Sequence, residues 1–376
     1  MDYMSAVSMY DDIVIFGYAD LGKYLYKELS KHFPGKNIIV CDNFLHKFPS
    51  SFCAENIISV EQAVLEFPNA LYIPTSIYHR EMMIEQLRNM EEFHGEIMVD
   101  DALFFFEKKR QQLNRCTTRK HLVFEVDIAR HCNLNCRGCL HFSPLSKPKF
   151  LDISSYQKDI CRLSKVFGGQ AEKISLMGGE PLLNPDIIQY VKIARTYFPN
   201  AKLLILTNGV LLDRMPEEFF LSCLKYGVTM QITQYPISLN YDELKKRINS
   251  YGIKEEQSLS PVETAGNFYR WPFDFSGKQN PKENFMNCLA ANSCITLYNG
   301  RLYTCGTIAY IDTFSAFFGL DMYSTSKDSI DIYEEDSPSN ILRFLARPVP
   351  FCRFCNVMGR HNVSYSISNR DISEWS

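Results

Sequence analysis

Residues 122–139 of this chain read LVFEVDIARHCNLNCRGC, an apolar strand pattern that leads directly into three cysteines. Leu122 to Val126 predict a buried strand. Cys132, Cys136 and Cys139 follow it with the spacing C-x3-C-x2-C. Three thiolates from one tight loop can bind three irons of a [4Fe–4S] cube, whereas ordinary electron-transfer clusters use four cysteines. The fourth iron of such a cube is then open to a substrate or cofactor.

Cysteine is frequent in this chain, with 13 among 376 residues. Residues 1–12 contain three Asp and no Lys or Arg, which argues against a signal peptide and predicts a cytoplasmic protein. Disulfides are rare in a reducing compartment, so metal binding or catalysis is the favoured explanation of clustered cysteines. A zinc site completed by His131 or His141 is the alternative for the triplet, but structural zinc sites usually divide their ligands between two distant pairs.

The composition excludes several classes of protein. Hydrophobic residues make up 46% and charged residues 22% of the chain, which is typical of folded domains with packed cores. The net charge of −3 argues against a broad basic surface and hence against a nucleic-acid partner. No apolar run approaches the ~18–20 residues that span a bilayer, so we expect no membrane association.

The pattern of strands and helices predicts an α/β protein of three domains. Residues 1–115 predict a Rossmann-like α/β domain, and residues 287–376 a small cluster-binding domain. Strands and helices alternate through residues 116–286, which implies parallel pairing with right-handed crossovers. Five or six such units are too few for a closed barrel, so we predict a partial (β/α)6 TIM-like barrel. Strands are predicted at residues 13–16, 38–41, 70–73 and 96–99, then at 122–126, 173–176, 203–206 and 228–232, with weaker ones near Ile253 and Ile295.

Two further motifs follow later strands of the predicted barrel. Gly178-Gly179-Glu180-Pro181 follows one strand, and Thr207-Asn208-Gly209 follows the next. With the cysteine triplet, and in this order, they resemble the radical S-adenosylmethionine (radical SAM) superfamily over roughly residues 120–260. The resemblance implies that SAM binds the open iron of a [4Fe–4S] cluster. The reduced cluster cleaves SAM to a 5′-deoxyadenosyl radical, which abstracts a hydrogen atom from the substrate.

The resemblance also implies roles for the motif residues in binding SAM. Gly178 and Gly179 let the backbone approach the methionine part of SAM without a Cβ in the way. Glu180 accepts a hydrogen bond from the SAM amino group. Asn208 contacts the ribose or the adenine, with a simple turn residue before Gly209 as the alternative.

The chain departs from the family's pattern at one position. Members often have an aromatic residue just before the third cysteine, placed against the adenine, and this chain has Gly138 there. His141 or Phe142 then supplies the stacking, or the adenine lies differently. The departure affects the adenine contacts and not cluster binding.

The C-terminal cysteines form a second group. Cys288, Gly300 and Cys305 follow the pattern C-x11-G-x4-C, and a C-x2-C pair comes later. The arrangement resembles the shortened auxiliary-cluster extension of the family, the twitch domain; the longer SPASM variant binds two clusters and needs more cysteines. A hairpin that turns at Asn299-Gly300 brings the first two cysteines together. A zinc ribbon on the same cysteines is the alternative to one auxiliary [4Fe–4S] cluster, for which the resemblance implies four ligands: Cys288, Cys305, Cys352 and Cys355.

Three further residues are candidates for catalysis. Cys294 either replaces Cys288 as a ligand or is a thiol that donates a hydrogen atom to a substrate radical. Arg270 and Asp274 lie in an aromatic-rich loop, residues 268–275, which we predict to close over the barrel and exclude water. Packing between barrel and tail is the alternative role of this loop. Arg270 is predicted to pair with a substrate phosphate.

The N-terminal domain carries an imperfect dinucleotide motif, Gly17-Tyr-Ala-Asp-Leu-Gly22, in which Ala19 replaces the middle glycine. The motif follows a strand and opens a helix, and Asp42 ends the next strand. These are the mechanics of a pyrophosphate held at a helix N-terminus and a ribose held by an acid. We predict a nucleotide on Gly17, Gly22 and Asp42, with docking or dimerisation as the alternative. The domain also resembles units attached to sugar- and polysaccharide-modifying enzymes.

These observations predict a radical SAM oxidoreductase or epimerase that acts on a small sugar or nucleotide-linked sugar by dehydrogenation, epimerisation or rearrangement. A flavodoxin- or ferredoxin-like protein is the expected electron donor. The second hypothesis is a peptide-modifying maturase, although a winged helix normally precedes such a barrel and a Rossmann-like pattern stands here. The third is a NAD-dependent enzyme or binding protein whose cysteines hold structural zinc.

Overall fold

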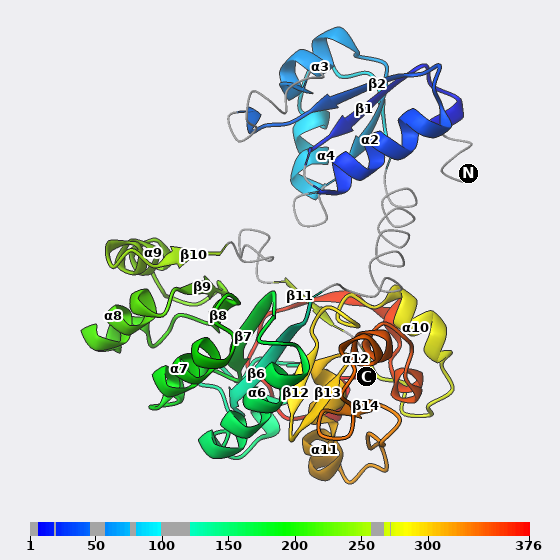
Figure 1. Ribbon diagram of the computed structural model, residues 1–376. Coiled ribbons are helices and arrows are strands. Elements are labelled where there is room, and N and C mark those ends of the chain that lie inside the picture. The colour runs from blue at the N-terminus through cyan, green and yellow to red at the C-terminus, as the bar shows by residue number, and fades with distance from the viewer. Residues whose placement is uncertain are drawn as a thin grey trace. The chain divides into compact units, whose positions relative to one another are not determined.

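The computed structural model describes residues 7–18, 20–45, 57–75, 80–98, 121–256, 267–270 and 272–376. The chain divides into two compact units, Met1–Arg110 and Gln111–Ser376 (Figure 1). The larger unit contains both the predicted barrel and the predicted cluster-binding domain. The boundaries at residues 115 and 286 therefore stay predictions.

The smaller unit is built around a five-stranded parallel sheet of order β3-β2-β1-β4-β5. Successive residues of β1 point to opposite faces: Ile13 and Ile15 pack against α2, and Val14 and Phe16 pack against α3 and α4. Helices on both faces and a strand order that reverses at β1 give the Rossmann-like arrangement that the sequence predicts. The elements are β1 Asp12–Phe16, α2 Asp20–His32, β2 Asn37–Cys41, β3 Ile57–Ile58, α3 Val60–Glu66, β4 Leu71–Pro74, α4 Arg80–Arg88 and β5 Glu96–Ile97.

The larger unit contains an eight-stranded sheet of order β10-β9-β8-β7-β6-β12-β13-β14. Five strands in chain order, β6 to β10, pair in parallel, and β12 also pairs in parallel with β6, on the side of β6 away from β7. The strand predicted near Ile295 is therefore confirmed as β12, and it pairs with β6, the first strand of the series. Among the described residues the sheet stays open, as predicted. The parallel strands are β6 Val123–Ala129, β7 Lys173–Gly178, β8 Lys202–Thr207, β9 Val228–Ile232, β10 Lys254–Glu255 and β12 Thr296–Tyr298.

Helices cover one face of this sheet (Figure 1). Phe124, Val126 and Ile128 of β6 belong to a hydrophobic core that they share with these helices. Because side chains alternate along a strand, Glu125 and Asp127 point to the opposite face. The covering helices are α6 Ile153–Val166, α7 Ile187–Tyr197, α8 Glu217–Lys225 and α9 Tyr241–Ser250.

The C-terminal part begins with the predicted hairpin. Asn299 (φ 49°) and Gly300 (φ 71°) form its turn, and positive φ at both positions is typical of a tight hairpin. The Gly300 amide donates to Asp159 Oδ2 of α6 at 3.0 Å, which anchors the turn. The remaining elements are β11 Asn267–Arg270, α10 Pro281–Asn287, β13 Arg301–Tyr303, α11 Gly306–Phe318, β14 Ser329–Asp331, α12 Pro338–Leu345, the short helix η6 Pro350–Phe354 and β15 His361–Ser364, which pairs with β11.

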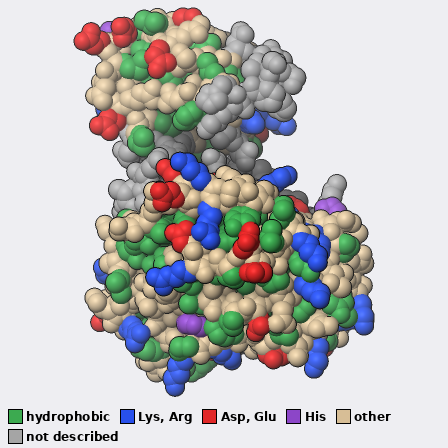
Figure 2. Space-filling view, turned by 90° about the vertical axis from the view of Figure 1, so that its left-hand side faces the viewer, with side chains coloured by type: hydrophobic (Ala, Val, Ile, Leu, Met, Phe, Trp, Pro, Cys, Tyr) green, Lys and Arg blue, Asp and Glu red, His purple; other side chains and the backbone are tan. Residues whose placement is uncertain are grey.

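The surface carries no single dominant charge on the face that Figure 2 shows, where acidic, basic and hydrophobic side chains are interspersed over the larger unit. None of the described helices has the length and apolar character required to cross a bilayer.

Candidate functional site

The three cysteines of the first motif lie in the loop that follows β6, residues 130–142. Their side chains are half-buried. Burial, together with the charges of Glu180 and Cys139, raises the pKa of Cys132 to about 11. Burial and then the charges of Cys139 and Cys132 raise the pKa of Cys136. The thiols are therefore close enough to interact electrostatically.

The two glycines of the second motif pack directly against this loop. A Cβ on Gly178 would lie 2.2 Å from the Ala129 carbonyl oxygen, and one on Gly179 would lie 2.1 Å from the His131 carbonyl oxygen. The Gly179 amide donates to the Ala129 carbonyl at 2.8 Å, and the Glu180 amide to that of His131 at 3.1 Å. The diglycine thus has a role within the chain: it lets the end of β7 join the end of β6. Its predicted approach to SAM stays a prediction.

Glu180 connects the second and third motifs. Its side chain is fully buried and accepts hydrogen bonds from the Leu182 amide at 3.0 Å, the Thr207 hydroxyl at 2.7 Å and the Asn208 amide at 2.9 Å. Burial raises its pKa, and although these three donors lower it in part, the result is a pKa of about 7. A carboxylate accepts about four hydrogen bonds, so most of its acceptor positions are used by its own chain, and its predicted bond to SAM stays a prediction.

Asn208 completes the connection back to the cysteine loop. Its side-chain amide donates to Asn133 Oδ1 at 2.8 Å and lies 3.7 Å from the Cys132 sulfur. Its Oδ1 accepts the Val210 amide at 3.0 Å. Asn133 was not singled out from the sequence, where only its place between two cysteines distinguished it.

These residues fit a [4Fe–4S] cluster by the chemistry of their donors, which are three thiols from one loop. No three described His, Cys, Asp or Glu side chains converge on a point as a single metal ion requires. A cube does not need such convergence, because its thiolates bind separate irons. The two histidines of the zinc alternative are engaged elsewhere through Nδ1: His131 accepts the Lys149 amide at 3.2 Å, and His141 lies 2.9 Å from Asp127 Oδ2.

The prediction that Phe142 stacks on an adenine does not fit the structure. Phe142 is fully buried, with its ring 5.1 Å from that of Phe314 and 6.2 Å from that of Phe273. The residue follows the cysteine loop, and only the tertiary fold directs it into this aromatic cluster.

The four cysteines of the second group also lie within electrostatic range of one another. Burial raises the pKa of Cys352 to about 12, and it raises the pKa of Cys355 and Cys305; the charge of Cys288 adds to all three. Asn284 of α10 was missed from the sequence. Its buried amide donates to the carbonyls of Cys352, at 2.9 Å, and of Cys355, and so connects α10 to the C-x2-C turn.

Cys294 lies between this second group and the sheet. Burial raises its pKa well above 9, and the charges of Glu125, Cys305 and Cys288 add to the effect. Burial also raises the pKa of Glu125, to about 7, and the two side chains are hydrogen-bonded. Glu125 was not predicted from the sequence, because its position in an apolar strand gave no sign of a partner 169 residues away.

The structure shows a local role for Asp274, and its predicted catalytic role stays a prediction. Its carboxylate accepts the Ser276 amide at 3.0 Å, the Ser276 hydroxyl at 2.6 Å and the Gln279 side-chain amide at 3.0 Å, and these bonds lower its pKa. It stabilises its own turn. The side chain of Arg270 lies outside the described residues, as does part of the proposed lid.

The smaller unit reproduces much of the dinucleotide-motif geometry. Gly17 has φ 101°, and a Cβ on Gly22 would lie 1.9 Å from the Gly17 carbonyl oxygen, so helix and strand meet closely, as the last glycine of such motifs allows. Asp42 follows β2 and accepts the Tyr18 amide at 2.8 Å and the Phe44 amide at 2.8 Å. Asp42 therefore fixes the glycine loop.

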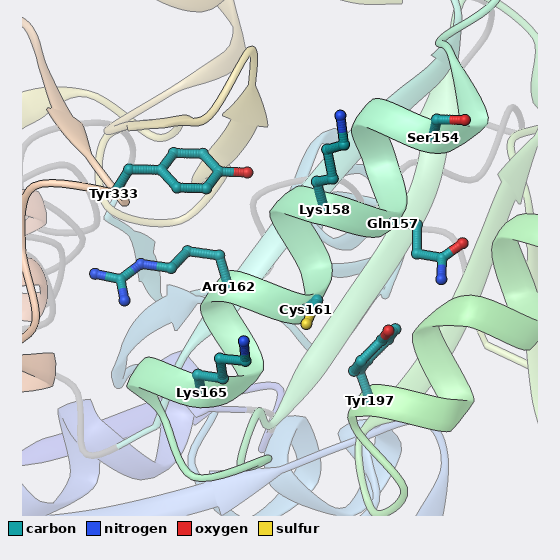
Figure 3. A pocket seen from close by; sticks show the side chains of 8 residues that line it. All are labelled: Ser154, Gln157, Lys158, Cys161, Arg162, Lys165, Tyr197 and Tyr333. Atoms are coloured by element: carbon teal, nitrogen blue, oxygen red, sulfur yellow. The ribbon is translucent and has the colours of Figure 1, made fainter.

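A surface pocket of about 610 Å³ lies on the outer side of α6 (Figure 3). The sheet-facing side chains of α6 are Tyr156, Ile160 and Leu163, so the pocket lies on the other side of the helix. None of the predicted site residues lines it. Its lining residues are Ser154, Gln157, Lys158, Cys161, Arg162, Lys165, Tyr197 and Tyr333.

Comparison with known proteins identifies a radical SAM domain within the larger unit. Residues 126–269 match the model of the radical SAM superfamily. GTP 3′,8-cyclase of Chlorobaculum tepidum is 38% identical over 89 residues, which are 24% of this chain and 26% of that protein. GTP 3′,8-cyclase of Nautilia profundicola is 32% identical over 100 residues, 27% of this chain and 31% of that protein. The chain thus spans only about a quarter to a third of the length of these relatives.

Solved structures give a distant likeness. BtrN, crystallised with AdoMet and 2-DOIA, is 19% identical over 64% of this chain and 94% of its own, with a TM-score of 0.43. Streptococcus suis SuiB is 14% identical over 72% of this chain and 77% of its own, with a TM-score of 0.30. By the match over residues 126–269, the larger unit contains a radical SAM domain, a domain whose family binds S-adenosylmethionine at a [4Fe–4S] cluster.

Proposed function

We propose that this chain cleaves SAM reductively at a cluster on Cys132, Cys136 and Cys139 and uses the radical to abstract hydrogen from a small sugar or nucleotide-linked sugar. When bound, the cluster and SAM supply the electron and the 5′-deoxyadenosyl radical. The substrate is then dehydrogenated, epimerised or rearranged. A flavodoxin- or ferredoxin-like protein is the proposed electron donor.

The observation that carries the proposal is the network linking the ends of three neighbouring strands around the thiols. The diglycine at the end of β7 packs on the backbone before Cys132, Glu180 accepts hydrogen bonds from the end of β8 and the turn after it, and the Asn208 side chain donates to Asn133. The carboxyl ends of parallel strands are where α/β barrels carry their chemistry. A rigid connection of this kind keeps the thiols and Glu180 on the same side of the sheet.

The test is the substitution Cys136→Ala under anaerobic conditions. We expect formation of 5′-deoxyadenosine in the presence of dithionite to fall to background, with the melting temperature unchanged. Cys161→Ala is the matched control, because this half-buried thiol of α6 lines the surface pocket and lies in neither cysteine group. Full SAM cleavage by Cys136→Ala would end the proposal.

We infer a small polar substrate from the charged groups on the face of the sheet opposite helices α6 to α9. Glu125 and Asp127 point to this face, and Asp127 lies 3.0 Å from Arg130 Nη1 and 2.9 Å from His141 Nδ1. Carboxylates and hydrogen-bonding groups of this kind recognise hydroxyl and amino groups, which sugars present at high density. Cys294 adjoins Glu125, and we propose it as the thiol that returns a hydrogen atom to the substrate radical.

The two roles of Cys294 are distinguished by metal content. Two four-iron clusters require about eight irons per chain. If Cys294 donates a hydrogen atom, the Cys294→Ala variant keeps this iron content. If Cys294 is a cluster ligand, the variant loses about half of its iron.

Cys352→Ala is proposed to remove the auxiliary cluster on Cys288, Cys305, Cys352 and Cys355, and to impair product formation more than SAM cleavage. Equal loss of both activities would argue against a separate auxiliary role.

A second function, nucleotide binding, is proposed for the smaller unit. The strand order and the positive φ of Gly17 favour it, because they place a tight turn at the point where the strand order reverses. Equilibrium titration with NAD and with nucleotide sugars tests it. We expect Asp42→Asn to weaken binding and the exposed Asp11→Asn to leave it unchanged; absence of binding by the unsubstituted protein would leave docking or dimerisation as the role.

A further inference from the structure

The C-terminal strap, residues 366–375, runs along the backbone of the cysteine loop. The Arg137 amide donates to the Ser366 carbonyl at 2.8 Å, and the Ser368 amide donates to the Asn135 carbonyl at 2.8 Å. Between these bonds, Ile367 forms an antiparallel bridge with Cys136. The strap therefore pairs with the loop at the second of its three cysteines.

Two side chains at the end of the strap form hydrogen bonds with the backbone of the loop at Gly138 and Cys139. Trp375, which is 1% exposed, donates its indole N–H to the Cys139 carbonyl at 3.0 Å. Its ring packs 5.5 Å from that of Phe314. Glu374, which is 2% exposed, accepts the Gly138 amide at 3.4 Å. Both side chains act on the backbone of the loop and leave the thiols free.

Glu374 also maintains the shape of the strap. Its carboxylate accepts the Ser368 hydroxyl at 2.6 Å and the Asn369 amide at 2.6 Å. It forms a capping box with Asp371 at the last short helix. One buried carboxylate thus connects both ends of the strap to the residue that precedes the third cysteine.

The strap accounts for the glycine that departs from the family's pattern. Gly138 has φ 66°, and a Cβ there would lie 3.0 Å from the Glu374 carbonyl oxygen. An aromatic side chain at this position would meet both the strained backbone conformation and the strap. The strap therefore packs closely against position 138, and glycine is the residue that this packing accommodates.

We propose that the strap positions the cysteine loop for the cluster, with Glu374 and Trp375 as positioning residues that hold the backbone from Cys136 to Cys139. The inference rests on the proposed cluster at the first cysteine motif. Glu374 and Trp375 lie far from the cysteine motif in the sequence, yet by this proposal they help to hold the SAM-binding cluster in place.

The variants Trp375→Phe and Glu374→Gln test the proposal in the full-length protein, with Arg370→Asn as an exposed control within the strap. Trp375→Phe keeps most of the apolar ring and removes the indole donor. After anaerobic reconstitution with iron and sulfide, three properties are measured: the rate of iron loss to a chelator, the SAM-dependent change in the electron paramagnetic resonance spectrum of the reduced cluster, and the melting temperature.

We expect each variant to lose iron about fivefold faster and to show an altered SAM-dependent spectrum, whereas Arg370→Asn matches the unsubstituted protein. A fivefold change corresponds to about 1 kcal/mol, the net value of one neutral hydrogen bond. Unaltered spectra and iron loss in both variants would overturn the proposal, as would iron loss that only follows the melting temperature. Cys136→Ala separates the two hypotheses: if it keeps the SAM-dependent spectrum, the cluster assignment itself fails.

Discussion

Replacing Gly179 by alanine tests whether the contact between the first two motifs holds the site together. The new Cβ would lie 2.1 Å from the carbonyl oxygen of His131, 2.3 Å from its carbonyl carbon and 2.9 Å from the Cys132 nitrogen. All three are backbone atoms, so no side-chain rotation relieves the overlap. The two loops must separate by about 0.9 Å to restore a 3.0 Å contact, the shortest that a Cβ tolerates.

The cost follows from what that separation breaks. The Gly179 and Glu180 amides each donate one hydrogen bond across the contact, and each such bond contributes about 1 kcal/mol. Overpacking adds about 1–3 kcal/mol. We therefore expect Gly179→Ala to destabilise the larger unit by roughly 3–5 kcal/mol and to displace the backbone that carries Cys132, so that less iron is bound.

The assay is equilibrium unfolding in urea, with iron per chain after anaerobic reconstitution as the second measurement. Gly35→Ala is the control, because a Cβ there meets nothing within 4 Å. If Gly179→Ala unfolds within about 0.5 kcal/mol of the unsubstituted protein and binds as much iron, the contact does not constrain the cysteine loop and the reasoning is refuted.

Three further predictions address other parts of the chain. Asn284→Ala removes the donor to the Cys352 and Cys355 carbonyls; we expect a loss of about 1–3 kcal/mol in urea unfolding and less iron at the second group, and an unchanged iron content would contradict this. Gly22→Ala would bring a Cβ to 1.9 Å from the Gly17 oxygen and should lower the unfolding transition of the smaller unit while SAM cleavage persists. Burial raises the pKa of Glu125 from 4.5 to about 7, so its protonated form favours the folded state: the stability of the unsubstituted protein relative to Glu125→Gln should be greatest below pH 4.5 and fall as the pH rises to about 7. Urea unfolding of both proteins at pH 5 and pH 8 measures this, and a difference that does not change with pH would contradict it.

Much of the fold could be predicted because the sequence patterns that indicate strands and turns involve only neighbouring residues. The strands at residues 13–16, 173–176, 203–206 and 228–232 are short apolar runs, and each forms a strand in the structure. The turn at Asn299-Gly300 was predictable because positive φ at two successive residues favours these residue types. The order of the motifs along the chain likewise indicated the radical SAM family, which the match over residues 126–269 confirms.

The roles of individual side chains were less predictable. Glu180 was assigned to SAM from its motif, yet three of its hydrogen bonds go to its own chain. Phe142 was assigned to the adenine from its position after the third cysteine, yet it is buried among aromatic rings. A motif indicates which residues lie at a strand end, but the hydrogen-bond and packing partners of their side chains come from other parts of the chain.

The amino-acid sequence alone determined where the strands lie, which loops carry cysteine and glycine, and hence the family and its cofactors, because periodicity and spacing are properties of adjacent residues. The tertiary structure alone decided that β12 adds beside β6, that Asn284 serves the C-x2-C turn, and that Trp375 binds the carbonyl of Cys139, 236 residues earlier. Such contacts depend on which backbone donors and acceptors meet when distant segments pack, and each buried group must find a partner there. No local pattern records that pairing.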